Sequence, residues 1–142
     1  MLTKTGNFFG HLLLLVIRIY WGYLLVVAGL GKLTNLSESA QFFASIYFPA
    51  PLFSAALAGV IETVAGIFLI LGLFSRFVAL FMVIYFLIAY ATAHHQAFIS
   101  FFSQPSLFFS QKPFLYLYTN LLVFCFGPGK VALDTWFGKK NR

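Results

Sequence analysis

The residues best suited to chemistry are two charged side chains inside long apolar runs. Glu62 lies in the run LAGVIETVAGIFLILGLFSR, residues 57–76, and Arg18 lies in an apolar run close to the N-terminus. If these runs cross a membrane, each ionised side chain costs at least ~2.5 kcal/mol at the bilayer centre. Each charge therefore needs a compensating partner.

The composition places these runs in a membrane. Of the 142 residues, 61% are hydrophobic and 8% are charged, far below the roughly 25% charged residues of an ordinary soluble domain. The net charge of +6 comes from basic residues that mostly lie near the ends of apolar runs. Because no basic patch is interleaved with polar residues, nucleic acid is excluded as a partner and membrane lipid is expected.

Arg18 and Glu62 are predicted to form one buried ion pair. Counted by helical rise from Phe8 and from Leu73, both lie roughly 15 Å from the same membrane surface. Small residues share a helix face with each charge, so the two faces can pack closely. These small residues are Gly22, Gly29, Ala55, Gly59 and Gly66. Two interpretations stay open: the pair only fixes the helix register, or it contacts a ligand or a proton.

Further polar residues continue from Glu62 toward the outer surface. By helical rise, Glu62 lies at about 16 Å from the inner surface, Asn120 at about 20 Å and His94 at about 28 Å. Lys32 lies at the same outer side. The predicted ligand-binding residues are therefore Glu62, Arg18, Lys32, His94 and Asn120.

No metal site or intrinsic redox group is expected. His94 and His95 point about 100° apart on a helix, and His11 belongs to the opposite membrane side. The single cysteine, Cys125, allows neither an internal disulfide nor a C-x-x-C pair. No haem ligand pair, cysteine cluster or dinucleotide-binding glycine fingerprint is present. Electrons would therefore come from a partner or a bound molecule, and the sequence assigns no catalytic residue.

Four apolar helices must position these side chains. A hydrocarbon core of about 30 Å requires roughly 20 helical residues, which predicts spans at about 8–30, 51–73 and 76–95 and a short fourth span at about 113–126. The chain is thus predicted to be all-α, a four-helix transmembrane bundle forming a single domain over residues 1–142. A short interfacial helix is expected between the first two spans, with Asn35 or Ser37 as its cap.

Basic residues predict the orientation of the bundle. With the N-terminus in the cytoplasm, six basic residues face inside and two face outside, which favours cytoplasmic positions for both termini. The inside set is Lys4, Arg76, Lys130, Lys139, Lys140 and Arg142, and the outside set is Lys32 and Lys112.

Several short motifs in order resemble those of the DoxX family. They follow Arg18 and comprise GLGKL at 29–33, FP at 48–49, IETVAGIFLILGLFSR at 61–76, AHH at 93–95 and GPGKVALD at 127–134. The motif positions carried over are Arg18, Gly31, Lys32, Glu62, Gly66, Gly72, Arg76, His94 and Gly129. Ala132 stands where serine is common in the pattern, so no role is assigned to a hydroxyl there.

The resemblance implies a small multi-pass protein of the bacterial inner membrane, close to redox enzymes. It favours a subunit or accessory of a membrane redox system that binds a quinone or a similar lipophilic molecule among its helices. The alternative is a noncatalytic anchor or assembly protein for a partner enzyme. A channel or transporter is disfavoured, because the chain has neither a repeat nor a broken polar helix, unless it forms a homo-oligomer.

Overall fold

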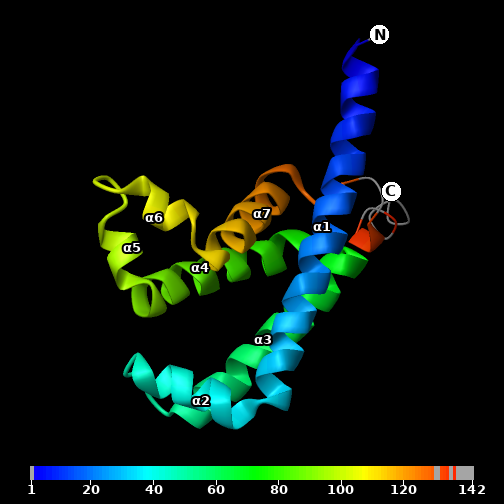
Figure 1. Ribbon diagram of the computed structural model, residues 1–142. Coiled ribbons are helices and arrows are strands. Elements are labelled where there is room, and N and C mark those ends of the chain that lie inside the picture. Colours follow the sequence, from blue (N-terminus) through cyan, green and yellow to red (C-terminus); the bar gives the residue numbers. More distant parts are fainter. Residues whose placement is uncertain (1, 130–131, 135, 137–142) are drawn as a thin grey trace.

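The computed structural model describes residues 2–129, 132–134 and 136, with side chains from residue 8 onward. All regular elements in these residues are helices, which confirms the all-α prediction (Figure 1). They are α1 (Leu2–Thr34), α2 (Leu36–Ser45), α3 (Pro51–Leu71), α4 (Ser75–Ala93), α5 (His95–Ile99), α6 (Pro105–Phe109) and α7 (Lys112–Phe126). The helices α3, α4 and α7 match three predicted spans to within about two residues at each end, the usual uncertainty of helix boundaries.

The first helix is longer than predicted. The α1 helix has 33 residues, so it is about 50 Å long. No proline interrupts it, and it continues past residue 30 to Thr34. Its N-terminal part extends beyond the turn between α3 and α4 (Figure 1). We call this end of the molecule the Arg18 end and the opposite end, where α4 stops, the His94 end.

Glycines hold α1 against α3, as the sequence predicts. A Cβ added to Gly22 would lie 3.0 Å from the carbonyl oxygen of Gly66, and one added to Gly29 would lie 2.6 Å from that of Gly59. The backbones therefore approach more closely than any larger residue allows, the packing that small residues provide in membranes. The register is fixed by these contacts, with Gly22 opposite Gly66 and Gly29 opposite Gly59.

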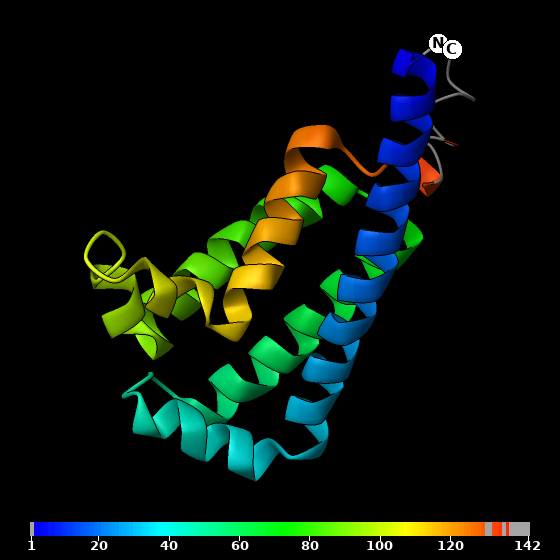
Figure 2. The ribbon, with the colours of Figure 1, turned by 45° about the horizontal axis from the view of Figure 1, so that its top comes forward.

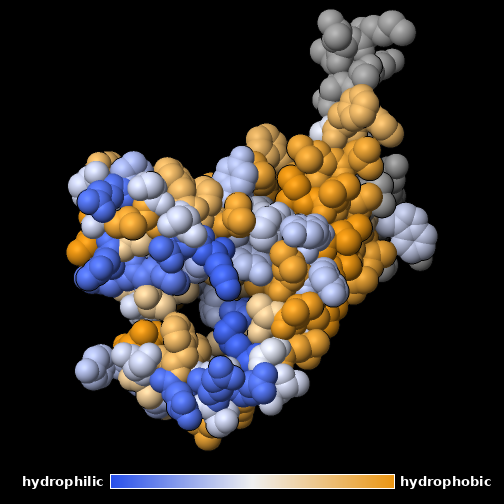
Figure 3. Space-filling view, viewed as in Figure 1, coloured by the Kyte–Doolittle hydropathy of each residue, from blue (hydrophilic) through white to orange (hydrophobic). Residues whose placement is uncertain are grey.

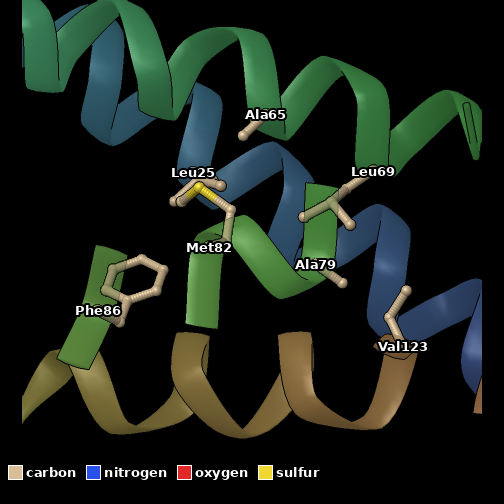
Figure 4. Packing of buried hydrophobic residues seen from close by; sticks show 7 residues of the cluster. All are labelled: Leu25, Ala65, Leu69, Ala79, Met82, Phe86 and Val123. Atoms are coloured by element: carbon tan, nitrogen blue, oxygen red, sulfur yellow. The ribbon is translucent and has the colours of Figure 1, made fainter. Parts of the chain in front are cut away.

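A second pair is formed by α4 and α7, and a shared core joins it to the first. Tyr116 of α7 stacks on Phe86 of α4 at a centroid distance of 5.3 Å, and it meets Trp21 of α1 edge to face. Side chains from all four long helices meet in a buried cluster (Figure 4). The cluster consists of Leu25, Ala65, Leu69, Ala79, Met82, Phe86 and Val123.

The two helix pairs diverge from the Arg18 end toward the His94 end (Figure 2). The predicted short helix between the first two spans is present as α2, which begins after Asn35 and lies across the His94 end of α3. The short helices α5 and α6 follow α4, and Phe108 of α6 stacks on Tyr90 in the last turn of α4 at a ring-centroid distance of 4.3 Å. Residues 96–112 are predicted as a loop, so neither helix is expected from the sequence, although Pro105 is a typical first-turn residue for α6.

The helices have the length and surface of a membrane protein. By length and composition, Phe8–Thr34, Pro51–Leu71 and Ser75–Ala93 could each cross a bilayer. The α7 helix has 15 residues, about 22 Å, which is shorter than a hydrocarbon core of about 30 Å. Large apolar side chains are exposed along α1, and the space-filling view shows this surface as mostly hydrophobic (Figure 3). The chain is therefore an all-α membrane helical bundle, in which a fourth spanning helix remains a prediction.

Candidate functional site

The carboxylate of Glu62 is bonded by side chains from two other helices. Lys32 of α1 forms an ion pair with it at 2.5 Å, between Nζ and Oε2. Tyr85 of α4 donates a hydrogen bond from its hydroxyl to Oε1 at 2.7 Å. The Glu62 side chain is 6% exposed and that of Lys32 is 28% exposed. Both carboxylate oxygens thus have donors, which compensates for much of the cost of burying this charge.

The predicted ion pair between Arg18 and Glu62 is wrong. Because Gly22 faces Gly66 and Gly29 faces Gly59, Glu62 lies level with the middle of that stretch of α1, about 11 Å along the helix from Arg18. The prediction assumed that Phe8 of α1 and Leu73 at the end of the second span lie at the same level in the membrane. In the structure α1 extends past the end of α3, so the two residues are not level (Figure 1). Lys32, expected nearer the membrane surface, is the residue that reaches Glu62.

Arg18 instead binds the segment that follows α7. It is 2% exposed, and its Nη1 donates a hydrogen bond to the carbonyl oxygen of Pro128. Its guanidinium lies against Gly72, where a Cβ would be 3.0 Å from Arg18 Cζ. Gly72 also has a φ of +70°, which a residue with a side chain rarely adopts. The Arg18 guanidinium therefore packs against the turn between α3 and α4 at a point where only a glycine leaves room for it.

Asp134 closes the same turn. Its two carboxylate oxygens accept hydrogen bonds from the backbone nitrogens of Phe74 and Ser75, each at 2.8 Å, and its own nitrogen donates to the carbonyl oxygen of Gly72 at 3.0 Å. These nitrogens open α4, so the carboxylate caps that helix from a distant part of the chain. Residues 130 and 131 of the GPGKVALD motif lie outside the described residues. The contacts of Pro128 and Asp134 nevertheless make this motif a clamp on the Arg18 end.

A cavity of about 690 Å³ lies between the two helix pairs and α2. Its wall is mostly apolar, and Glu62, Lys32 and Tyr85 form a polar group on it. His94 and Lys112 line it as well, toward the His94 end. Figure 3 shows the molecular surface hollowed beside α2. The cavity has the size and character of a small-molecule site, which is typically apolar with a few converging polar groups.

Two of the five predicted site residues do not line this cavity. Arg18 belongs to the clamp, and Asn120 is 1% exposed, with its Nδ2 donating to the carbonyl oxygen of Tyr116 at 2.8 Å. Glu62, Lys32 and His94 are brought to one cavity, as their order along the helices suggested. Tyr85 and Lys112 also line the cavity but are not among the five predicted ligand-binding residues. Tyr85 lies two helical turns before Thr92 among seven tyrosines, and no local signal separates it from the others.

The arrangement can bind a polar head group beside an apolar body. The Tyr85 hydroxyl and the Lys32 ammonium are donors, and the Glu62 carboxylate is an acceptor. These groups now satisfy one another, so a ligand can exchange with part of this network. Within the described residues, no cluster of three or more His, Cys, Asp or Glu side chains is gathered that could hold a metal ion.

Comparisons with known proteins identify bacterial relatives of this chain. The "Inner membrane protein YphA" of Escherichia coli (strain K12) is 32% identical over 83 residues, which is 58% of this chain and 59% of that protein. The "Putative oxidoreductase CatD" of Bacillus subtilis (strain 168) is 29% identical over 129 residues, which is 89% of this chain and 90% of that protein. No solved structure matches the chain.

The family comparison covers the helices that carry the Glu62 site. The DoxX family model matches residues 13–95, from the middle of α1 through the end of α4. This range holds Arg18, Lys32, Glu62 and Tyr85, and it is more than half of the chain. The chain is a membrane protein that belongs to the DoxX family.

Proposed function

We propose that this protein binds a quinone or a similar lipophilic molecule in the cavity between its helix pairs, as a subunit or accessory of a membrane redox system. The observation that carries the proposal is the hydrogen-bonded group of Glu62, Lys32 and Tyr85 on the wall of a mostly apolar cavity. A quinone carbonyl oxygen would accept from Tyr85 or Lys32, and a quinol hydroxyl would donate to Glu62.

The cavity wall supports entry from the membrane. Leu57, Ile84 and Ile88 line the cavity and are still 47%, 52% and 51% exposed. Exposed apolar side chains on the cavity wall would suit the entry of a molecule dissolved in lipid. Burial of its apolar body would supply most of the binding free energy, at about 25 cal/mol per Å².

The redox setting is supported by the name of the Bacillus subtilis relative, "Putative oxidoreductase CatD". The electrons would come from a partner enzyme or from the bound molecule, since the sequence contains no cluster, haem or dinucleotide motif. The competing role, a noncatalytic anchor for a partner enzyme, would need the cavity only as a gap filled by lipid.

We also propose that the protein resides in the bacterial inner membrane with both termini in the cytoplasm. The name of the Escherichia coli relative supports this membrane. In the described residues, Arg76 lies at the Arg18 end, whereas Lys32 and Lys112 line the cavity toward the His94 end. The side chain of Lys4 and the residues Lys130, Lys139, Lys140 and Arg142 lie outside the described part. Reporter fusions after residue 142 and between residues 100 and 104 should report opposite sides.

Removing one donor tests the proposed ligand site. Tyr85→Phe keeps the ring and deletes the hydroxyl that reaches Glu62. The matched control is Tyr90→Phe on the same helix, where the buried hydroxyl donates to the carbonyl oxygen of Phe108 and the ring does not line the cavity. Titration of the purified protein with a decyl-tailed quinone should show about tenfold weaker binding for Tyr85→Phe, the equivalent of one hydrogen bond.

The control should bind within about twofold of the unmodified protein, because its deleted hydroxyl lies outside the cavity. Equal losses in both variants, or no saturable quinone binding by the unmodified protein, would contradict the proposal. A soluble enzyme that copurifies with a quinone-free protein would favour the anchor.

A further inference from the structure

A second, more polar pocket of about 360 Å³ adjoins the cavity at the His94 end. The two spaces share Thr92, Ala93 and His94 as lining residues, so they are neighbours at the end of α4. The second pocket adds the imidazole of His95 and the amides of Gln96 and Gln111. A mostly apolar space and a more polar one thus lie side by side at this end of the molecule.

The polar pocket is rich in hydrogen-bond donors that are not used within the described part of the chain. Gln111 donates one amide hydrogen to the carbonyl oxygen of Leu107 at 3.1 Å. No described residue forms a hydrogen bond with the side chains of His94, His95 or Gln96. Several donors are therefore available to one head group, and hydrophilic residues gather on the surface over α5 and α6 (Figure 3).

The charge balance at this end favours an anion. The whole chain has three acidic residues, and none of them lines the polar pocket. Glu62 is paired with Lys32, Asp134 caps α4 at the Arg18 end, and Glu38 is exposed on α2. Lys112 follows Gln111 directly, lines the cavity and has no ion-pair partner among the described residues. The polar pocket thus has no carboxylate on its wall, and the ammonium group of Lys112 lies on the wall of the adjoining cavity.

We propose that these adjoining spaces bind a single-chain acidic amphiphile of the fatty-acid class. Its carboxylate would accept hydrogen bonds from His94, His95 or Gln96 and lie near Lys112. Its alkyl chain would extend into the apolar cavity toward Tyr85. A cavity of about 690 Å³ suits one chain, since sites of roughly 300–1,000 Å³ hold drug-sized ligands. This uses the polar pocket, which the proposed quinone site does not need.

The acidic amphiphile and the quinone would share the apolar cavity. Binding of one therefore excludes the other, so the fatty acid content of the membrane would control access of the quinone to Glu62 and Tyr85. The two ligands depend on different polar groups, and variants separate them.

Competition binding tests the inference. The full chain is placed in nanodiscs of zwitterionic lipid at mildly alkaline pH, and bound radiolabelled palmitate is displaced by palmitate, methyl palmitate or acetate. We expect palmitate to compete at least tenfold better than methyl palmitate, and acetate not to compete. The double variant Lys112→Gln/His95→Ala should lose this preference, whereas Arg76→Gln, which changes an exposed cation at the Arg18 end, should retain it.

Equal competition by palmitate and its methyl ester, or an equal loss of preference in Arg76→Gln, would overturn the inference. Displacement by acetate would overturn it too, because it would indicate a site for small anions. Quinone titration in the same nanodiscs separates the two proposals. Palmitate preference without quinone binding would refute the proposed function alone, and quinone binding without palmitate preference would refute this inference alone.

Discussion

The two buried charges of the bundle are satisfied in different ways. Arg18 donates to a backbone carbonyl and lies against Gly72 at a turn that Asp134 also binds, and nothing about these contacts involves the cavity. Glu62 is held by two side chains, Lys32 and Tyr85, beside open space. Backbone partners fix a charge in place, whereas side-chain partners next to a cavity can turn toward a ligand. The first charge thus serves the fold, and the second is the one that we propose contacts a ligand.

The glycine contacts between α1 and α3 set the register that keeps Arg18 away from Glu62. Disrupting them should have the largest effect on the free energy of unfolding. Gly29→Ala would place a Cβ 2.4 Å from Oγ1 of Thr63 and 2.6 Å from the carbonyl oxygen of Gly59. Because backbone atoms cannot move aside cheaply, α1 and α3 must part, and we expect a loss of about 3 kcal/mol in the free energy of unfolding. Unfolding in mixed detergent measures it.

Gly31→Ala is the matched control on the same helix, since nothing lies within 4 Å of its added Cβ. It should be neutral or stabilising by about 0.5 kcal/mol, as expected for alanine in place of glycine within a helix. Similar losses in both variants would mean that the α1–α3 contact does not set the register.

A pair of double-mutant cycles comes next in size. Lys32→Met and Glu62→Gln should be coupled by about 2 kcal/mol, because they remove the two halves of one ion pair. Arg18→Met and Glu62→Gln should be additive within about 0.5 kcal/mol, because the two sites are separated by two helical turns. Strong coupling between Arg18 and Glu62 would restore the pairing that the sequence first suggested and would remove the contrast between the two charges.

Much of the bundle follows from the sequence, because hydropathy and helix signals are local. Pro51 and Pro113 mark the starts of two helices, and the glycine faces predict which helices touch. The register along that contact could not be derived, since it depends on how far α1 extends past the end of α3. Because of this extension of α1, Lys32 and not Arg18 lies opposite Glu62 and pairs with it.

The sequence predicts the charged residues of the candidate site but not its other residues. Glu62 and Lys32 are charges in or beside apolar runs, whereas Tyr85 is one aromatic residue among many and is selected by the packing of α4 against α3. Asp134 is similar, because the backbone nitrogens that it caps lie about sixty residues earlier in the sequence. No local pattern reveals a contact over that separation.

Loss of the Asp134 cap at the Arg18 end should lower the free energy of unfolding by a smaller amount. Asp134→Ala removes the acceptor for the backbone nitrogens of Phe74 and Ser75. Loss of a helix cap typically costs about 1 kcal/mol. We therefore expect a lower unfolding temperature for Asp134→Ala, with the ligand affinity of the remaining folded protein unchanged because the cavity lies elsewhere.

If Glu62 serves binding while the Arg18 end serves the fold, quinol affinity and unfolding temperature should respond to different substitutions. Glu62→Gln keeps the shape of the side chain but removes its charge, and Lys32 is exposed enough to be hydrated when unpaired. We predict that Glu62→Gln weakens binding of a decyl-tailed quinol about tenfold, because the charged acceptor for the quinol hydroxyl is lost, whereas Asp134→Ala lowers the unfolding temperature and leaves that affinity unchanged. Unchanged quinol affinity in Glu62→Gln, or equal losses of affinity in both variants, would contradict this division of roles.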